Sequence, residues 1–496
     1  MKQHTIHLLP LGKELKVNDR TPLIDVLHEY GVEFPCGGKG TCGKCQVRLL
    51  EGEVEITEAH QRRLDQLGLP PDRRLACLSF CTGPLTIEIE QFKYLILADE
   101  SEFEFEPENG FGVAVDLGTT TLVAQLVDLK SAKVLAVETM LNPQVRYGAD
   151  VISRIQACLE GHTSEMTRFI RAAIGGMIEK MLNQQQVILR KIVIVGNTAM
   201  QLIFSGQDVR PLSAYPFHVS DLGRKVFNTS DLGWDFPCGC QVEFMPSIGS
   251  FVGSDILAGI AATGLHKRRQ YTALIDLGTN GEIVVGNEEH IVCASTAAGP
   301  AFEGTNISMG MRAVTGAISS LSLEAGKIRA TVIGNTEPKG ICGSALIDAI
   351  AIFRELDMIG MFGEINLDEE NINISGNVKL TRKDINEFQL AKAAIATGLK
   401  ILTRSLSIDL DEIDKIYIAG GFGSYINIKH VVDTGMIPIS VEKIQKMGNT
   451  ALIGAKMFLF GDNTDVPEIL KKIHHINLEA NPDFQDIYVG EMILQG

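Results

Sequence analysis

Four cysteines near the N-terminus have the residue type and the spacing of metal ligands. Five residues separate Cys36 from Cys42, two separate Cys42 from Cys45, and 31 separate Cys45 from Cys77. Thiolates spaced in this way bind iron–sulfur clusters or zinc. A cluster would give this segment one-electron chemistry, whereas structural zinc would give it no redox role.

The spacing favours a [2Fe–2S] cluster over zinc. Structural zinc sites usually combine two short C-x2-4-C pairs, and this segment has one such pair with two outlying cysteines. The glycines between Cys36 and Cys45 let a loop wrap a cluster with backbone N–H groups aimed at sulfur. The pattern C-x5-C-x2-C is one residue longer than the plant type, and it resembles the adrenodoxin-like ferredoxins.

Two cysteines, Cys77 and Cys81, are candidates for the fourth ligand. In related ferredoxins an Arg-Leu-x-Cys segment supplies it, so the resemblance of Arg74-Leu-Ala-Cys77 implies Cys77. Cys81 is then expected to be a small buried side chain. The same is expected of the remaining cysteines, Cys158, Cys238, Cys240, Cys293 and Cys342.

The peptide Asp-Leu-Gly-Thr occurs twice further along the chain, at Asp116–Thr119 and at Asp276–Thr279. Each copy lies between two apolar stretches and predicts a strand, a tight turn and a second strand. Such a hairpin offers backbone N–H groups and polar side chains to phosphate oxygens, and its aspartate can hold Mg²⁺. One copy is only a turn, but two copies indicate a duplication around a nucleotide.

Each half also has a second apolar strand that ends in a loop of small residues. Lys191–Val195 leads into Gly196-Asn-Thr-Ala-Met200, and Lys415–Ala419 leads into Gly420-Gly421-Phe-Gly423. Glycines allow the backbone to approach a flat or anionic ligand closely. These loops are therefore further candidates for the nucleotide site.

The order of these motifs resembles the actin, heat-shock chaperone and sugar-kinase superfamily. The resemblance implies two ribonuclease-H-like halves that close on ATP and Mg²⁺ by a hinge motion. It assigns the first phosphate loop to Asp116, Gly118, Thr119 and Thr120, the second to Asp276, Gly278, Thr279 and Asn280, and adenosine contacts to Gly420, Gly421 and Gly423.

The expected fold class is α/β, with a ferredoxin domain of the β-grasp type before the duplicated body. The expected divisions are a ferredoxin domain at 1–92, a linker at 93–110, a first half at 111–270 and a second half with a tail at 271–496. The run Ala98–Gly110 holds six carboxylates and no base, which is typical of an extended linker. A swinging linker and a packed junction both remain open, and Phe103 and Phe105 are candidates for docking.

The fused N-terminal domain narrows the resemblance further. Together with Leu141–Asp150, Gly196–Met200 and Ala298–Gly304, it resembles the reductive activators of corrinoid proteins, which serve corrinoid methyltransferase and O-demethylase systems. The resemblance covers nearly the whole chain. It implies an ATP-hydrolysing enzyme of anaerobic metabolism that reduces inactive Co(II) corrinoid to Co(I) through a [2Fe–2S] cluster. Its partners would be a corrinoid protein and a low-potential electron donor.

Other polar residues have weaker signals. Glu282 follows the second hairpin, where it either orients the attacking water or is an exposed strand carboxylate. Glu303 lies in a loop that is a candidate contact to the nucleotide or to the partner protein, and the alternative is that it has no functional role. Ser344 precedes an apolar helix, where ordinary capping is favoured over an anion site. Arg146 and Asp150 are expected to form a surface salt bridge.

Three rival functions remain open at this point. A redox-sensing small-molecule kinase would need a base and an acceptor pocket, for which no distinct candidate is found. A 2-hydroxyacyl-CoA dehydratase-type activator would carry its cysteines inside the nucleotide body. A ferredoxin electron carrier with a non-catalytic nucleotide module would turn over no ATP.

Composition limits location and partners. A formal charge of −16 argues against nucleic acid, whose phosphates would repel the chain. No apolar run reaches the roughly 18 residues of a membrane helix, and Met1–Leu11 lacks the layout of a signal peptide. The expectations are a cytoplasmic protein that binds no membrane, with a homodimer among the oligomeric states left open.

Overall fold

The computed structural model describes all of the chain except residues 1, 10–12, 28–29, 31, 33–39, 41–42, 44, 90–102, 184–188, 237–239, 279, 305, 314–315, 422, 424, 461–464 and 496. Cys36, Cys42 and Thr279 lie outside the described residues, as do residues 93–102 of the expected linker.

The N-terminal sheet has the topology of a β-grasp fold. Its strands in spatial order are β2 (Lys13–Asn18), β1 (Gln3–Leu9), β7 (Leu85–Glu88), β4 (Gln46–Glu51) and β5 (Arg73–Leu75). β1 and β7 are parallel, and the other neighbours are antiparallel. Alternate residues of β1 are buried, as expected of a strand with one face on a core.

Short elements complete this domain. They are β3 (Thr21–Pro22), α1 (Leu23–Leu27), α2 (Glu58–Gln66), the 3-10 turn η2 (Ala76–Leu78) and β6 (Phe80–Cys81). Leu23 and Leu27, one helical turn apart on α1, are fully buried in the core of the domain.

The first half of the body is a six-stranded sheet. In spatial order it contains β10 (Lys133–Leu141), β9 (Thr121–Asp128), β8 (Phe111–Leu117), β11 (Leu189–Gly196), β13 (Gln241–Phe244) and β12 (Lys225–Asn228). β8, β9 and β10 form an antiparallel meander, whereas β11 and β13 run parallel to β8.

The second half repeats this arrangement. Its sheet contains β23 (Ile444–Gly448), β22 (Lys415–Ala419), β14 (Thr272–Leu277), β15 (Gly281–Gly286), β16 (Ile291–Thr296) and β24 (Ile473–His475). β14, β15 and β16 form the meander, and β22 and β23 run parallel to β14. The shared order confirms the duplicated α/β body.

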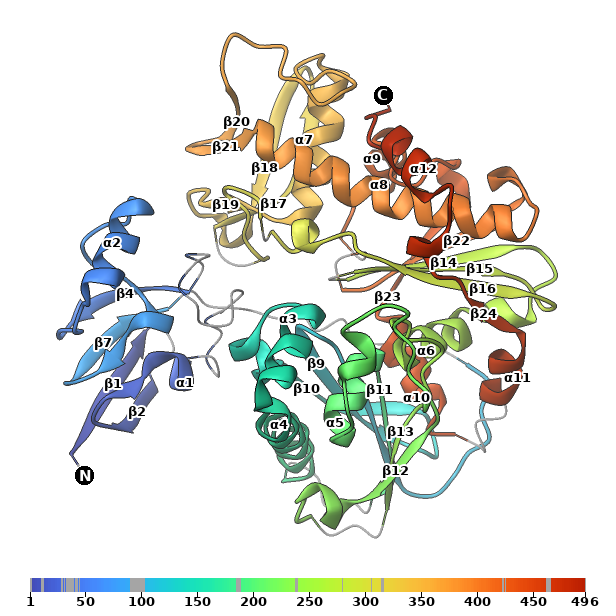
Figure 1. Cartoon of the computed structure of the whole chain (residues 1–496), viewed down its shortest axis with the longest axis horizontal. Helices are drawn as coiled ribbons and strands as arrows, with labels where there is room; N and C mark the ends of the chain where they lie inside the picture. The colour runs from blue at the N-terminus through green and yellow to red at the C-terminus, as the bar shows by residue number, and fades with distance from the viewer. Residues whose placement is uncertain are drawn as a thin grey trace.

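Helices cover the sheets, and an insertion extends the second half (Figure 1). The helices are α3 (Val151–Ala157), α4 (Thr163–Asn183), α5 (Thr198–Ser205), α6 (Ser254–Thr263), α7 (Gly343–Glu355), α8 (Arg382–Ser405), α9 (Ile428–Asp433), α10 (Thr450–Met457), α11 (Asp465–Lys472) and α12 (Phe484–Glu491). The insertion contains β17 (Ala317–Glu324), β18 (Lys327–Val332), β19 (Gly340–Ile341), β20 (Asn371–Ser375) and β21 (Val378–Thr381). None of the described helices has both the length and the apolar character needed to cross a membrane.

α6 and α10 lie between the two sheets and join the halves (Figure 1). They approach so closely that a Cβ atom on Gly454 would lie 2.1 Å from the carbonyl oxygen of Ala258. One hydrophobic core includes side chains from both halves, among them Leu257 of α6 and Leu452 of α10.

The described end of the expected linker is packed against this shared core. The rings of Phe103 and Phe105 lie 5.5 and 4.9 Å from the ring of Phe460, between centroids. Glu108 donates its backbone N–H to the carbonyl of Leu129 at 3.0 Å. Residues 103–110 therefore belong to the body, because aromatic burial holds this acidic segment in place.

Candidate functional site

Two of the four predicted cluster ligands meet in the N-terminal domain. The Sγ atoms of Cys45 and Cys77 lie 3.2 Å apart. Cys45 is buried just before β4, and Cys77 lies in the turn η2. The backbone N–H of Ala76 donates to the carbonyl of Cys45 at 2.9 Å, which fixes the two segments to each other.

Cys81 has the environment of a structural thiol. It is fully buried, and its Sγ lies 3.2 Å from the carbonyl oxygen of Gly83. Burial raises the pKa of the Cys81 thiol, which disfavours the thiolate that a metal requires. The environment thus supports the choice of Cys77 over Cys81, and the complete ligand set remains a prediction.

The described part of the cysteine loop is anchored by α2 and by neighbouring side chains. The Nε of Arg63 donates to the carbonyl of Gly40 at 3.1 Å, and the Nε2 of Gln46 donates to that of Gly43 at 2.9 Å. Both glycines have a positive φ, of 71° and 69°, which other residues adopt only with strain. The loop conformation near the ligands is therefore specified by its sequence.

The two Asp-Leu-Gly-Thr segments form matching hairpins. Asp116 and Asp276 lie near the ends of β8 and β14. The N–H of Gly118 donates to the carbonyl of Thr121 at 3.1 Å, and that of Gly278 donates to the carbonyl of Asn280 at 3.0 Å. A Cβ on Gly118 would lie 2.6 Å from the Thr121 oxygen, so this turn requires glycine.

The hairpin aspartates belong to a group of four carboxylates from both halves. The others are Glu282, paired with Asp276 across the hairpin, and Asp255 in the first turn of α6. All four side chains are partly buried. When ionised, these carboxylates repel one another electrostatically.

This environment shifts the protonation of the group. Burial raises the pKa of Asp116 to about 6, even though a hydrogen bond from Asn449 lowers it. Burial, followed by the charge of Asp116, raises the pKa of Asp255 to about 7. Burial and then the charges of Asp255 and Asp116 raise the pKa of Asp276 to about 7. The pKa of Glu282 lies well above its ordinary value, first through burial and then through Asp255 and Asp276.

Asp255 was not among the residues predicted from the sequence. It follows β13 in the peptide Gly253-Ser254-Asp255, which has no distinctive motif. Tertiary contacts place it, because the Ser254 hydroxyl lies 3.1 Å from both the N–H and the carbonyl of Gly196. A Cβ on Gly253 would lie 2.3 Å from the same carbonyl. The only sequence signal was a small-residue segment before an apolar helix.

Hydrogen bonds connect the first hairpin to other loops at the same sheet edge. The Nδ2 of Asn449, the N-cap of α10, donates to Asp116 at 2.8 Å and so joins the two halves. The Nδ2 of Asn197 donates to the hydroxyl of Thr119 at 2.8 Å. The Thr120 hydroxyl lies 3.5 Å from Glu303, which places this carboxylate beside the first hairpin.

The glycine loop after β22 contacts the second hairpin. Gly420 has a φ of 89°, and a Cβ there would lie 2.5 Å from the carbonyl of Leu277 and 2.7 Å from Asp276. Gly421 has open space where its Cβ would point. Gly423 abuts the carbonyl of Ala419, since its Cβ would lie 2.4 Å away. The loop is thus tight against the hairpin at Gly420 and accessible at Gly421.

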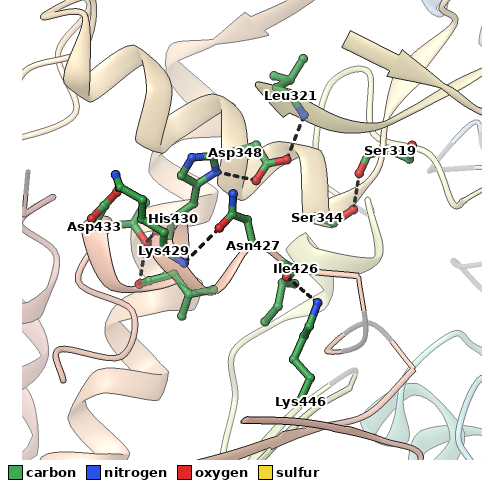
Figure 2. A network of polar contacts seen from close by, with 12 residues as sticks. Ser319, Leu321, Ser344, Asp348, Ile426, Asn427, Lys429, His430, Asp433 and Lys446 are labelled. Atoms are coloured by element: carbon green, nitrogen blue, oxygen red, sulfur yellow. Dashed lines mark hydrogen bonds and ion pairs between the residues drawn. The ribbon is translucent and has the colours of Figure 1, made fainter. Parts of the chain in front are cut away.

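A polar network holds the segment that follows this loop (Figure 2). The Nδ1 of His430 on α9 lies 2.7 Å from Asp348 of α7, and both side chains are largely buried. The other oxygen of Asp348 accepts the N–H of Leu321 on β17 at 2.9 Å. Lys446 donates to the carbonyl of Ile426 at 3.3 Å. α9, and with it the exit of the glycine loop, is fixed to α7 and β17.

Some expectations were wrong. Arg146 pairs with Asp25 of the N-terminal domain at 2.7 Å rather than with Asp150. Asp150 instead caps α3, where it accepts the N–H of Ser153 at 2.8 Å, because a helix start offers free donors. Ser344 does not cap α7 either, since its hydroxyl donates to the carbonyl of Ser319 at 2.7 Å.

The carboxylates of this site suit a cation that binds together with a phosphate ligand. Among the described residues, no three or more His, Cys, Asp or Glu side chains form a group that could hold a metal ion. Mg²⁺ is commonly bound by one or two carboxylates together with phosphate oxygens and water. Carboxylates that share a site with raised pKa values fit such a cation, because its charge would relieve their repulsion.

Comparisons with protein-family models cover most of the chain. Residues 6–82 match the 2Fe-2S iron-sulfur cluster binding domain, and residues 111–268 match the RACo middle region. Residues 270–496 match the C-terminal domain of RACo, the ASKHA domain. The matches support a [2Fe–2S] cluster in the first segment and nucleotide binding in the last.

Known proteins are similar along nearly the whole length. The corrinoid activation enzyme RamQ of Eubacterium limosum is 32% identical over 97% of both chains. The [Co(II) methylated amine-specific corrinoid protein] reductase of Methanosarcina barkeri is 27% identical over 77% of this chain and 76% of its own. A solved structure of a reductive activator for corrinoid, iron-sulfur protein superposes with a TM-score of 0.69 at 29% identity, and covers 99% of this chain and 98% of its own.

Proposed function

The chain belongs to the family of reductive activators of corrinoid proteins, and we propose that it reduces the inactive Co(II) state of a partner corrinoid protein to Co(I) at the expense of ATP. The observation that carries this proposal is the similarity to a corrinoid activation enzyme. That similarity extends over both the cysteine-bearing domain and the two nucleotide halves. The parts needed for electron transfer and for ATP use are thus joined in one chain.

The proposed cluster ligands are Cys36, Cys42, Cys45 and Cys77. The contact of the Cys45 and Cys77 thiols at 3.2 Å supports a shared site. When bound, the [2Fe–2S] cluster supplies the single electron that Co(II) needs. The chain's own contribution is the loop anchored by Arg63 and Gln46, which holds the thiols in place.

The proposed nucleotide site lies between the hairpins. Asp116 and Asp276 would hold Mg²⁺, which neutralises phosphate charge when bound. The N–H groups and polar side chains of the hairpins would bind phosphate, and the glycine loop would bind adenosine. The phosphate residues are Gly118, Thr119, Thr120, Gly278, Thr279 and Asn280, and the adenosine residues are Gly420, Gly421 and Gly423.

Asp255 is the proposed base that orients the attacking water. A general base works best when its pKa is close to the working pH, and the pKa of Asp255 is about 7. Glu282, which the sequence suggested for this role, accepts the Ser295 hydroxyl at 3.2 Å, and burial raises its pKa above the ordinary value.

ATP is needed because reduction of a corrinoid to Co(I) is uphill from a [2Fe–2S] cluster. A one-electron gap of some hundreds of millivolts corresponds to about 5–10 kcal/mol. Nucleotide can shift this equilibrium only through a difference in affinity between the states before and after transfer. A low-potential electron donor would reduce the cluster again after each transfer. A homodimer would have two clusters and two nucleotide sites.

The decisive experiment is an anaerobic reduction assay. Protein reduced with dithionite or Ti(III) is mixed with a Co(II) corrinoid protein, with and without MgATP, and the absorbance of Co(I) is followed. We expect Co(I) to appear only with MgATP. Cys77→Ser should abolish the signal and lower the bound iron, whereas the matched variant Cys81→Ser should retain both.

Two results would contradict the proposal. One is the absence of Co(I) with a panel of corrinoid proteins, while the cluster is intact and ATP is bound. The other is a phosphorylated small molecule in an acceptor screen, which would favour a kinase.

A further inference from the structure

An ion pair joins the N-terminal domain to the first half of the body. The guanidinium of Arg146, in the turn η3 (Pro143–Tyr147), lies 2.7 Å from the carboxylate of Asp25 on α1. In Figure 1, α1 lies on the side of its domain that faces α3 and α4. The side chains retain 20% and 36% of their exposure, so the pair is partly shielded from water.

Arg146 is held in position by aromatic rings. Its guanidinium carbon lies 5.4 Å from the ring centroid of Tyr147 and 5.0 Å from that of Phe169 on α4. Such contacts restrict a long side chain before it meets its partner. The body therefore presents a prepared cationic site to α1.

The same turn is attached to the first phosphate hairpin through Asn142. The Nδ2 of Asn142 donates to the carbonyl of Gly118 at 2.9 Å, and its backbone N–H donates to the carbonyl of Thr120 at 2.9 Å. Its Oδ1 accepts the N–H of Gln144 at 3.0 Å and so caps η3. Asn142 is fully buried and joins the hairpin backbone to η3.

On the other side of the ion pair, α1 is attached to the proposed cluster site. The N–H of Leu23, the first residue of α1, donates to the carbonyl of Ser79 at 2.9 Å. Ser79 directly follows η2, which contains Cys77. The strand before α1 pairs with the strand after η2, Thr21 with Cys81. α1 and the segment that carries the proposed ligand Cys77 are therefore joined by backbone hydrogen bonds.

We propose that the Asp25–Arg146 pair couples the two domains, so that nucleotide phosphate on the first hairpin strengthens the docking of the cluster domain on the body. The inference rests on the proposed function for the identity of the two ligands. Phosphate immobilises Gly118 and Thr120, these hold Asn142, and Asn142 fixes the turn that carries Arg146. The docked position is then the nucleotide-bound position of the cluster.

Hydrogen–deuterium exchange of the anaerobic holoprotein tests this coupling. The Mg²⁺ complex of a non-hydrolysable ATP analogue is added, and peptides that cover residues 116–121 and 23–27 are compared. We expect exchange to slow in both segments of the wild type. In Arg146→Glu, exchange should slow at residues 116–121 alone.

The outcomes separate this inference from the proposed function. If exchange in the wild type slows at residues 116–121 and is unchanged at residues 23–27, the coupling is wrong, whereas the proposed nucleotide site is still supported. No change at residues 116–121 would overturn the nucleotide site, and the coupling with it.

Charge reversal provides a second measurement. Coupling is reciprocal, so loss of the ion pair should weaken nucleotide binding, by about fivefold. Arg146→Glu and Asp25→Arg should each raise the nucleotide Kd, and the double variant should restore it. Arg168→Glu, a neighbouring exposed arginine on α4 that pairs with Glu165, is the matched control and should bind normally. Normal binding by both single variants, or no recovery in the double variant, would overturn the inference.

Discussion

The four carboxylates of the proposed nucleotide site destabilise the nucleotide-free protein when they are ionised. In an unfolded chain aspartates ionise near pH 4, whereas Asp116, Asp255 and Asp276 in the folded protein have pKa values of about 6 to 7. Between these values the folded state binds more protons than the unfolded state. The stability of the nucleotide-free protein therefore falls as the pH rises from about 4 to about 7.

Asp255→Asn should stabilise the nucleotide-free protein at pH 8, because it removes one buried charge and relieves its neighbours. We expect its Tm at pH 8 to exceed that of the wild type by about 2 °C or more, and the difference to vanish near pH 4. The same variant should lose ATP turnover by about 100-fold if Asp255 orients the water. Thermal melts at several pH values and a phosphate-release assay measure both effects.

Asp368→Asn is the control for this prediction, because Asp368 is an exposed aspartate outside the site. It should leave the melting profile and turnover unchanged. A stabilisation by Asp255→Asn that is as large at pH 4 as at pH 8 would contradict the electrostatic explanation.

The sequence pointed to candidate residues in local motifs and missed those that only tertiary contacts bring together. Asp116 and Asp276 could be found because each belongs to a short motif at a strand end. Asp255 could not, because contacts with the loop at Gly196 bring it to the site. The prediction that Arg146 pairs with Asp150 was also wrong, because its partner Asp25 lies in another domain.

At the scale of elements, the glycine loop after β22 contains neighbouring glycines with different constraints. Gly420 has a left-handed backbone and touches the second hairpin, whereas Gly421 faces open space. Gly420 should therefore affect the stability of the fold, and Gly421 should affect nucleotide binding.

Gly420→Ala should destabilise the nucleotide-free protein by about 1–3 kcal/mol, because alanine is strained at positive φ and its Cβ would meet the Leu277 carbonyl. Gly421→Ala, the matched variant, should keep the wild-type Tm and weaken nucleotide binding. Thermal melts and calorimetric titration distinguish the two. Equal melting temperatures for both variants would show that the loop is not tight at Gly420.

The strands and turns of both halves were predictable from the sequence, because apolar strands around Asp-Leu-Gly-Thr are local patterns. The contacts that hold the segment after the glycine loop were not predictable from the sequence. Asp348 and His430 are 82 residues apart, and only the folded chain brings them to 2.7 Å. The β-grasp topology was expected only through the resemblance to ferredoxins.

At the scale of the whole molecule, the hydrophobic cores predict how the chain unfolds. One core combines side chains from both halves, such as Ala114 and Leu274, so the halves cannot separate without exposing it. The core of the N-terminal domain is separate and contains residues between Ile6 and Ile89 only. The body should therefore unfold as one cooperative unit, and the N-terminal domain as another.

Scanning calorimetry of the anaerobic holoprotein should show two transitions. A nucleotide analogue with Mg²⁺ should raise the Tm of the body by mass action. The N-terminal transition is identified by loss of the cluster absorbance. A single transition in which cluster and body melt together would mean that the two cores are more strongly coupled than their separation suggests.

The repeated sheet order gives the two halves of the body similar architectures, and the proposed nucleotide site takes one hairpin from each half. A cavity with true twofold symmetry would accept an asymmetric ligand in either of two opposite orientations. The hairpins differ in the residue paired with the aspartate, which is Val123 in the first half and Glu282 in the second. An apolar side chain on one side and an acid on the other break the degeneracy. A triphosphate bound between the hairpins would meet different side chains on its two sides, and its terminal phosphate would be directed the same way in every turnover.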